Sequence, residues 1–175
     1  GGDTAGNTGT LTDVRVSGLS AGNIDYANIE ALAVFLGGGA GSGAGVNNVF
    51  NIQSTAAATP VIVTDRGGNG TVNVSSTGRL VNSIRSLVTL IADGGTDTLN
   101  FDDGGETANQ SGTLTATTIT GFGLSAAGLT YGGFETLNLY TGSGVDTVTV
   151  SATHAGTTNI DTGSANDTII VADTN

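Results

Sequence analysis

Residues 142–171 read GSGVDTVTVSATHAGTTNIDTGSANDTIIV, and the pattern of this segment indicates how the chain folds. It holds two glycine-rich turns, GSGVD and GSAND, each of which ends in an aspartate and is followed at once by a short alternating strand. The two turns lie 21 residues apart, and residues 157–161 fit a third strand midway between them. Turns and strands at a fixed step are typical of a chain that coils on itself. We therefore predict an all-β fold, a parallel β-helix or β-roll-like solenoid of short strands and Gly-Asp-rich turns.

The composition favours a narrow, repetitive interior. The chain has 175 residues, of which 37% are hydrophobic and 30 are Gly, and it contains no Trp, Met or Cys. Its core must come from Val, Leu, Ile and Ala. Such residues fill the thin layers of a solenoid better than the interior of a sandwich or barrel, the other folds that regular short strands allow. The absence of Cys also excludes disulfides and thiolate metal sites.

The charge of the chain bears on its partners. Four Arg and no Lys face fifteen Asp and Glu, which gives a formal net charge of −11. This excess of carboxylate repels phosphates and anionic headgroups, so we expect no nucleic-acid partner and no binding to a membrane surface. No run of about 18 apolar residues is present, so we expect no membrane insertion. The first nine residues do not resemble a signal peptide, so we expect any export signal to lie outside this chain or to have been removed.

A long repeat organises the whole sequence. Residues 1–20 recur as residues 104–123 with nine identities at a constant offset of 103. Further segments match with small slips in the offset: 23–34 with 128–139, 48–55 with 146–153, and 66–74 with 163–171. The first copy also carries a Gly/Ala-rich insertion at 37–47. We predict a first long repeat at 1–103 and a second, incomplete repeat at 104–175, continuous with the first as one rod.

The expected strands are short and alternate with period two, so that apolar side chains face one side of each strand. They are 11–16, 29–36, 49–52, 61–64, 71–74, 80–84, 87–91, 98–101, 114–119, 147–150, 157–161 and 168–171. Residues 80–92 also fit a helical spacing, although their β-branched content favours two strands. A coil of about 21 residues and a strand spacing of about 4.8 Å predict roughly eight coils.

Four asparagines each lie between apolar residues of a strand: Asn51, Asn73, Asn100 and Asn138. They fit stacked amide ladders along the rod, in which side chains bond to one another. They fit equally well the solvent-facing polar positions of half-buried strands. The sequence leaves these two interpretations open.

Two strings, GSGVDTVTV and DGGTDTLNF, resemble degenerate forms of the nonapeptide GGxGxDxUx of repeats-in-toxin proteins, in which U is a large apolar residue. The longer stretch 96–150 resembles the roughly 100-residue repeats of very large bacterial surface or secreted proteins, and this likeness covers essentially the whole chain. The resemblance implies an extracellular or cell-surface location, a parallel β-helix or β-roll, and a structural or adhesive role. The chain departs from the nonapeptide pattern in that its Asp turns are isolated, and Asn48 and Gly70 stand where the second copy has Asp146 and Asp167.

Carboxylates at the turns are the candidate ion ligands. Asp97, Asp146 and Asp167 end glycine-rich turns at equivalent points before strands. Stacked on one edge of a solenoid they would repel one another, and Ca²⁺, which takes several oxygen ligands, would relieve that repulsion. Alternatively, each Asp accepts hydrogen bonds from the amides of its own turn. Asp102 and Asp103, beside Glu106, form the densest cluster and are the second candidate for calcium. We expect no required cofactor, with calcium as the one ion to test.

The functional expectation is structural. Carboxylate pairs also occur in glycoside hydrolases, but the four scattered Arg and the absence of Lys argue against a catalytic site, so we expect no enzyme. The end coils of a solenoid carry unpaired backbone N–H and C=O groups, which predict head-to-tail self-association or continuation into further repeats. We expect a stalk, an adhesin body or a self-assembling filament subunit. The alternative is a calcium-binding secretion or folding module of an exported toxin or enzyme.

Overall fold

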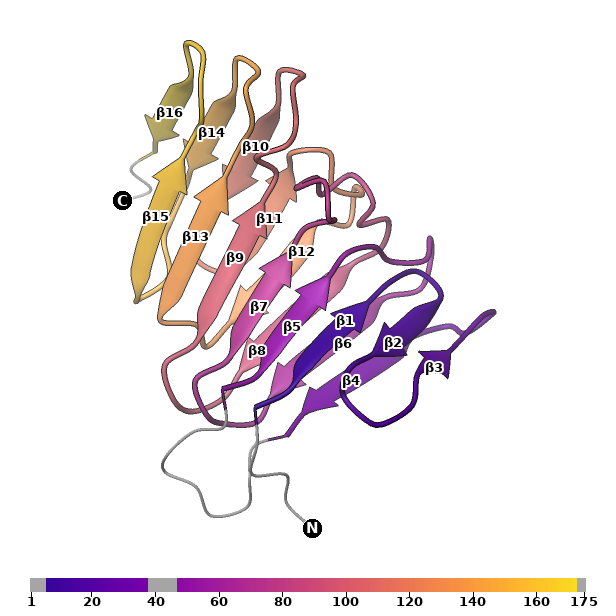
Figure 1. Ribbon diagram of the computed structural model, residues 1–175. Coiled ribbons are helices and arrows are strands. Elements are labelled where there is room, and N and C mark those ends of the chain that lie inside the picture. The colour runs from indigo at the N-terminus through magenta and orange to yellow at the C-terminus, as the bar shows by residue number, and fades with distance from the viewer. Residues whose placement is uncertain (1–5, 38–46, 173–175) are drawn as a thin grey trace.

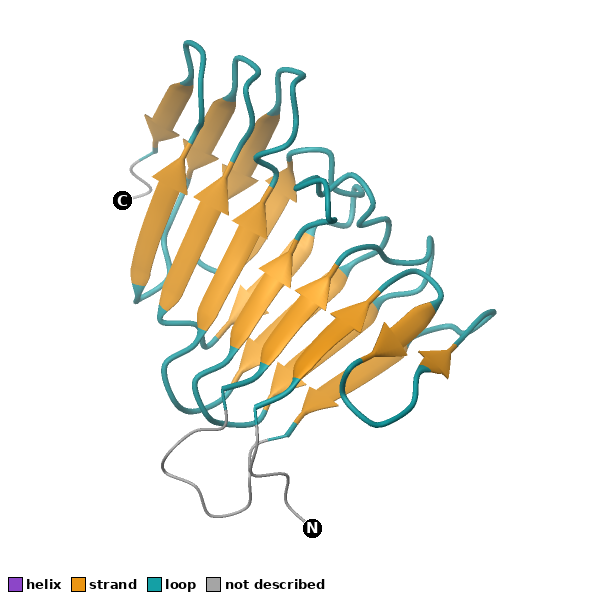
Figure 2. Ribbon diagram, viewed as in Figure 1, coloured by secondary structure: helices purple, strands orange, loops and turns teal. Residues whose placement is uncertain are grey.

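The computed structural model describes residues 6–37 and 47–172, and in these segments the chain consists of strands and turns (Figure 2). Sixteen strands form two eight-stranded sheets, which face each other as two layers (Figure 1). The prediction of an all-β, solenoid-like fold is confirmed. The described segments contain no helix long and apolar enough to cross a membrane.

The two sheets, A and B, are built alternately along the chain. Sheet A has the order β15 (Thr157–Asp161), β13 (Thr136–Tyr140), β9 (Thr98–Asp102), β7 (Thr71–Val74), β5 (Val49–Ile52), β1 (Thr8–Leu11), β2 (Arg15–Ser17) and β3 (Ile24–Asp25). Sheet B has the order β16 (Thr168–Val171), β14 (Thr147–Val150), β10 (Ser111–Leu114), β11 (Thr118–Gly121), β12 (Leu129–Gly132), β8 (Val88–Ala92), β6 (Val61–Asp65) and β4 (Leu32–Leu36). From β4 to β9 and from β13 to β16, each strand crosses to the other sheet, and neighbours in a sheet pair in parallel. This is the connectivity of a two-sheet solenoid.

The core lies between the two sheets and follows the alternation of the strands. In β9, Leu99 and Phe101 are fully buried, whereas Asn100 between them faces outward. The same pattern recurs in β13, where Leu137 and Leu139 are buried. Each fully buried side chain of this size stabilises the fold by about 1.5–3 kcal/mol. Burial of alternate aliphatic side chains is therefore what holds the two layers together.

The expected strands at 11–16 and 114–119 are wrong, because each of these segments is two antiparallel strands joined by a tight turn. Leu11 faces Val16 across the first hairpin, and Leu114 faces Ile119 across the second. The second turn is closed by the Thr115 backbone N–H, which donates to the Thr118 carbonyl oxygen at 2.9 Å. A third antiparallel strand then completes each meander, β1–β2–β3 in sheet A and β10–β11–β12 in sheet B.

The expected uniform coil is also wrong. The sequence step between neighbouring asparagines in sheet A is 22, 27, 38 and 21 residues in turn. The step of 38 includes the meander β10–β11–β12, and the step of 27 includes an irregular corner at 75–87. That corner replaces the strand expected at 80–84 and excludes the helix considered for 80–92. Because three neighbouring strands in each sheet belong to one meander, the chain makes fewer than the eight coils expected.

Equivalent strands of the two repeats lie in opposite sheets. The meander β1–β2–β3 and the strands β5 and β7 lie in sheet A, while their repeat counterparts β10–β11–β12, β14 and β16 lie in sheet B. In the other direction, β4 lies in sheet B and its counterpart β13 in sheet A. One repeat therefore advances the solenoid by a half-integral number of coils. A repeat and its successor are related by a half-turn about the long axis of the rod together with an advance along it.

Candidate functional site

The aspartates expected to hold calcium lie on opposite edges of the solenoid. Asp146 and Asp167 precede the neighbouring strands β14 and β16 of sheet B, whereas Asp97 precedes β9 of sheet A. Strands of the two sheets run in opposite directions, as the arrows in Figure 1 show for β9, β14 and β16. The structure therefore brings Asp146 and Asp167 together and places Asp97 away from both.

Each of these carboxylates accepts a hydrogen bond from the backbone of a neighbouring strand's turn. The Asp97 Oδ1 atom accepts from the Gly70 N–H at 2.6 Å, and the Asp146 Oδ1 atom accepts from the Gln110 N–H at 2.7 Å. The Asp167 Oδ1 atom accepts from the Asp146 N–H at 2.9 Å. The donor thus belongs to the adjacent level of the solenoid, not to the aspartate's own turn as the sequence suggested. The residue before each of these strands ties one level to the next.

Asp97 lies in a small cluster of acidic side chains with Asp65 and Glu135. Burial, with smaller contributions from the charges of Asp65 and Glu135, raises the pKa of Asp97 to about 6 in spite of the hydrogen bond from the Gly70 N–H. Asp65 is 2% exposed, and neither of its carboxylate oxygens has a hydrogen-bond partner of good geometry among the described residues. Burial also raises the pKa of Asp65, although the Asn48 side chain partly opposes this. The protonated forms of both carboxyls are therefore favoured by their surroundings.

A steric relation explains the glycine in the first repeat. A Cβ atom at Gly70 would lie 1.8 Å from the Asp65 Oδ2 atom. In the second repeat the counterparts of Asp65 and Gly70 are Thr162 and Asp167. The carboxylate thus sits on one side of the turn in the first copy and on the other side in the second. Of these two positions, each copy has an acidic residue at one.

The cluster expected at Asp102, Asp103 and Glu106 is divided by the structure. Asp103 is buried, its Oδ1 atom accepts from the Val81 N–H at 3.0 Å, and its Oδ2 atom has no partner in the described segments. Burial raises the pKa of Asp103 to about 7, with further contributions from Glu106, Asp146 and Asp102. Glu106 instead accepts from the backbone N–H groups of its own turn. Asp102 faces outward, so only Asp103 turns toward Asp146.

Over residues 6–37 and 47–172, no three Asp, Glu or His side chains converge in a geometry that would hold a metal ion. Among the described residues, Asp65, Asp103 and Asp146 have buried carboxylate oxygens without a hydrogen-bond partner. Calcium at Asp97, Asp102, Asp103, Asp146 or Asp167 stays a prediction. Ca²⁺ would need backbone carbonyls and water to complete six to eight ligands.

The asparagines form the amide ladder that the sequence left open. The side-chain N–H of each donates to the side-chain oxygen of the next toward the N-terminus, at distances of 2.7 and 2.8 Å. The ladder runs through Asn159, Asn138, Asn100, Asn73 and Asn51. Sequence reasoning missed Asn159, although it shares with Asn138 and Asn100 a Thr two positions earlier. The ladder crosses the outer face of sheet A along the axis of the rod.

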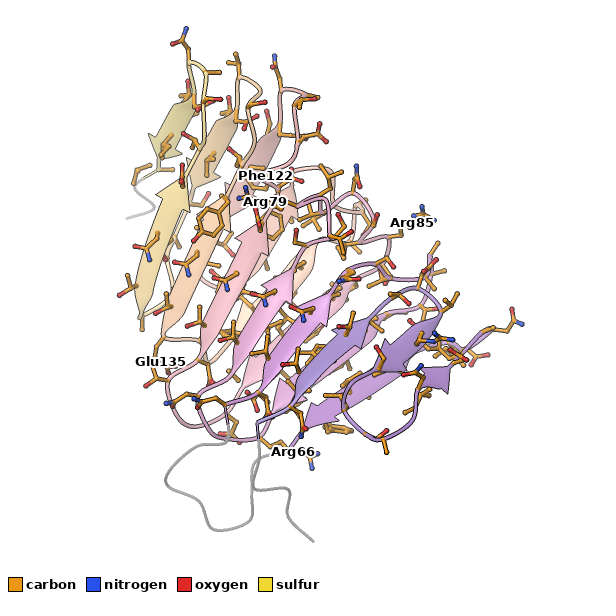
Figure 3. All side chains as sticks on the ribbon, in the orientation of Figure 1. Arg66, Arg79, Arg85, Phe122 and Glu135 are labelled. Atoms are coloured by element: carbon orange, nitrogen blue, oxygen red, sulfur yellow. The ribbon has the colours of Figure 1, made fainter. Side chains whose placement is uncertain are left out.

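A shallow groove of about 410 Å³ lies over this ladder. Its lining is polar except for one aromatic ring: Asn51, Gln53, Asn73, Ser75, Ser76, Arg79, Asn100, Asp102 and Tyr140. A second hollow of about 220 Å³ shares Arg79 and Tyr140 and continues to Asp161 and Ser164. Figure 3 shows Arg79 over the ends of the sheet A strands, whereas Arg85 projects from a loop elsewhere. Sequence reasoning did not find this groove.

Neighbouring groups hold both the backbone and the guanidinium of Arg79. Its backbone has a φ of 58°, a left-handed conformation that costs free energy in a residue other than glycine. The Arg79 carbonyl oxygen accepts from the Gly105 N–H at 2.8 Å, and its Nε atom lies 2.9 Å from the Asp102 Oδ2 atom. A Cβ atom at Gly104 would lie 2.3 Å from the Arg79 Nη2 atom, so glycine makes room for the guanidinium. The surrounding structure therefore holds one of four Arg beside the ladder.

No family model, curated protein or solved structure matches this chain. The resemblance to toxin nonapeptides and to bacterial surface repeats stays an expectation. Function is therefore inferred from the geometry of the chain itself.

Proposed function

We propose that this chain is a structural segment of an extracellular repeat protein, serving as a stalk, adhesin body or filament subunit, with no catalytic activity. The observation that carries the proposal is the exposure of apolar side chains in the last coil. In β14, the inward-facing Val148 and Val150 are 0% and 7% exposed. Their partners in β16, Ile169 and Val171, are 48% and 77% exposed. The apolar interior thus reaches the end of the solenoid with no described residues over it, and such a surface favours a partner.

The first repeat indicates what fits on this end. By their order and alternation, β15 and β16 are the counterparts of β6 and β7. In the first repeat, β6 pairs in parallel with β8, where Val61 faces Val88, and β7 pairs with β9, where Val72 faces Leu99. A strand pair of the β8–β9 type therefore fits the free edges of β15 and β16. Its inward side chains would cover Ile169 and Val171.

The end of the rod formed by β3 and β4 is also complementary to a β8–β9 pair. The counterparts of the edge strands β3 and β4 are β12 and β13. Inside the molecule β12 pairs in parallel with β8, and β13 pairs in parallel with β9. A β8–β9 pair is therefore complementary to both ends of the rod. Both ends therefore present edges for growth along the long axis. A further repeat would supply a β8–β9 pair, whereas a second chain would place its own end strands on these edges.

The test compares two residues of one strand with almost equal exposure. Ile169 faces the interior and is 48% exposed, whereas Ile170 faces outward and is 46% exposed. We expect sedimentation velocity of the full chain to show association that grows with concentration. Ile169→Asp should abolish it, and Ile170→Asp should leave it unchanged. A chain that stays monomeric at high concentration, or two variants with equal effects, would contradict end-to-end assembly.

The second candidate is a calcium-binding secretion or folding module of an exported toxin or enzyme. It is favoured by the buried, unpartnered carboxylate oxygens of Asp65, Asp103 and Asp146. A module that folds on calcium loses its β-sheet signal when the ion is removed, because binding and folding are coupled. Circular dichroism and calorimetry in Ca²⁺ and in EDTA separate the two candidates. A ladder-held rod keeps its β signal in EDTA.

A further inference from the structure

The groove on the outer face of sheet A contains an ion pair, Arg79 with Asp102, and an aromatic ring, Tyr140, that the ladder between coils does not use. It combines a regular row of amides, a fixed ion pair and one aromatic ring. Arg79 lies at the irregular corner between β7 and β8. The ion pair and the ring lie beside the middle of the amide row.

The amides of the ladder keep half of their hydrogen-bonding capacity. Each amide has two N–H donors and two acceptor lone pairs, and the ladder uses one of each in Asn73, Asn100 and Asn138. The remaining donors and acceptors recur at the strand spacing of about 4.8 Å. Adjacent donors and acceptors match vicinal hydroxyl groups. The length of one sugar ring in an extended glycan is close to the same spacing.

A second row beside the ladder completes the groove. Asp102 and Tyr140 are register partners on β9 and β13, and Ser75 and Gln53 continue their row. The Tyr140 ring is half-buried and lies where the two hollows meet. An aromatic ring of this kind offers an apolar face to a sugar and keeps its hydroxyl in water.

The charges of the groove select against charged ligands. Arg79 and Asp102 are its charged lining residues, and they form a pair with an Nε–Oδ2 distance of 2.9 Å. The rest of the chain carries a large negative charge, which repels anionic polymers. A protein partner is disfavoured as well, because protein interfaces centre on clusters of apolar and aromatic residues. What remains is an uncharged, hydroxyl-rich chain.

We propose that this groove binds a neutral polysaccharide, which lies along the ladder and crosses β5, β7, β9 and β13. Tyr140 stacks on a sugar ring, Arg79 and Asp102 bond to hydroxyls at one end, and the free amide groups of Asn73 and Asn100 bond along the chain. This site does not depend on end-to-end assembly of the rod.

The test is affinity electrophoresis of the full chain in native gels that contain hydroxyethylcellulose, laminarin, galactomannan or, as the anionic comparison, polygalacturonate. We expect retardation by at least one neutral polymer and none by polygalacturonate. Tyr140→Ala and Arg79→Ala should each weaken binding about tenfold. Arg85→Ala is the matched control, because it removes an exposed Arg outside the groove lining, and it should bind as the original chain does.

Circular dichroism of each variant checks that the β-sheet signal is kept. If Arg79→Ala fails to fold, Tyr140→Ala alone decides the result. Binding to polygalacturonate in place of the neutral polymers would overturn the proposal. Absence of retardation by all three neutral polymers, or equal binding by Tyr140→Ala, would overturn it too.

Discussion

The side-chain amide of Asn138 donates to the side-chain oxygen of Asn100 at 2.8 Å, although 38 residues separate them in the sequence. The intervening chain forms the meander β10–β11–β12 in the other sheet and returns in register. An insertion in one sheet therefore leaves the ladder of the opposite sheet unbroken. The solenoid accommodates extra residues in one sheet because the strands of the other sheet still pair in register.

The ladder predicts that a substitution in its middle lowers the stability of the chain more than a substitution at its end. Within the ladder, the Asn100 side chain donates one hydrogen bond and accepts another. The exposed Asn159 side chain donates one hydrogen bond to Asn138 and accepts none from another Asn of the ladder. Asn100→Ala should lower the free energy of unfolding by about 1–3 kcal/mol, because it leaves two partners unsatisfied. Asn159→Ala should cost less than about 1 kcal/mol. Urea unfolding measures both values, and equal losses would contradict a cooperative ladder.

The buried carboxyls predict that stability falls as pH rises. The folded-state pKa values of Asp97 and Asp103 are raised from 3.8 to about 6 and about 7. The folded chain therefore binds more protons than the unfolded chain between pH 4 and 7, and the free energy of unfolding decreases across that window. Thermal unfolding at pH 5 and pH 8 should give the higher melting temperature at pH 5.

Asp103→Asn should remove much of this pH dependence, because the amide does not ionise. The exposed Asp93→Asn serves as the control and should keep the dependence. A melting temperature that rises from pH 5 to pH 8 in the original chain would show that these carboxyls are not buried as described. Calcium at these carboxylates would flatten the same curve, so the measurement is made in EDTA.

The first repeat has Asp65 and Gly70 where the second has Thr162 and Asp167. This relation predicts that a destabilising substitution at Gly70 is offset by a second substitution at Asp65. Gly70→Asp should destabilise the chain by several kcal/mol, because its Cβ would overlap the Asp65 Oδ2 atom and a second buried charge would be added. The double variant Asp65→Thr with Gly70→Asp reproduces the residues of the second repeat, Thr162 and Asp167, and should recover most of that loss. A double-mutant cycle by denaturant unfolding measures the coupling. Additive effects would show that the two positions do not share the space.

The sequence was most informative where strands alternate strictly. TVNV at 71–74 and TVTV at 147–150 each place two Val on one side, and both were predicted with their bounds. The turn at Thr115–Thr118 was missed because it contains no Gly or Pro and its threonines continue the alternation. Local pattern cannot separate such a turn from a longer strand.

Other features depend on relations that spacing alone does not contain. Asp97 and Asp146 end similar turns, but the number of crossings between sheets decides which edge each one lies on. The opposite placement of the two repeats follows from the same count. Arg79 was overlooked because its position depends on an irregular corner and on the open space at Gly104.

The solenoid depends on parallel, in-register pairing of β9 with β13 across the meander, and engineered cysteines test this pairing directly. The chain has no native Cys, so a Thr98→Cys, Thr136→Cys variant reports on one contact. Neighbouring strands place these positions about 4.8 Å apart, within reach of a disulfide. The measurement is the fraction that cross-links under mild oxidation, by non-reducing electrophoresis after cleavage between the two sites. We predict efficient cross-linking for this pair and none for Thr98→Cys with Thr113→Cys, whose strands lie in opposite sheets; the reverse result would contradict the solenoid.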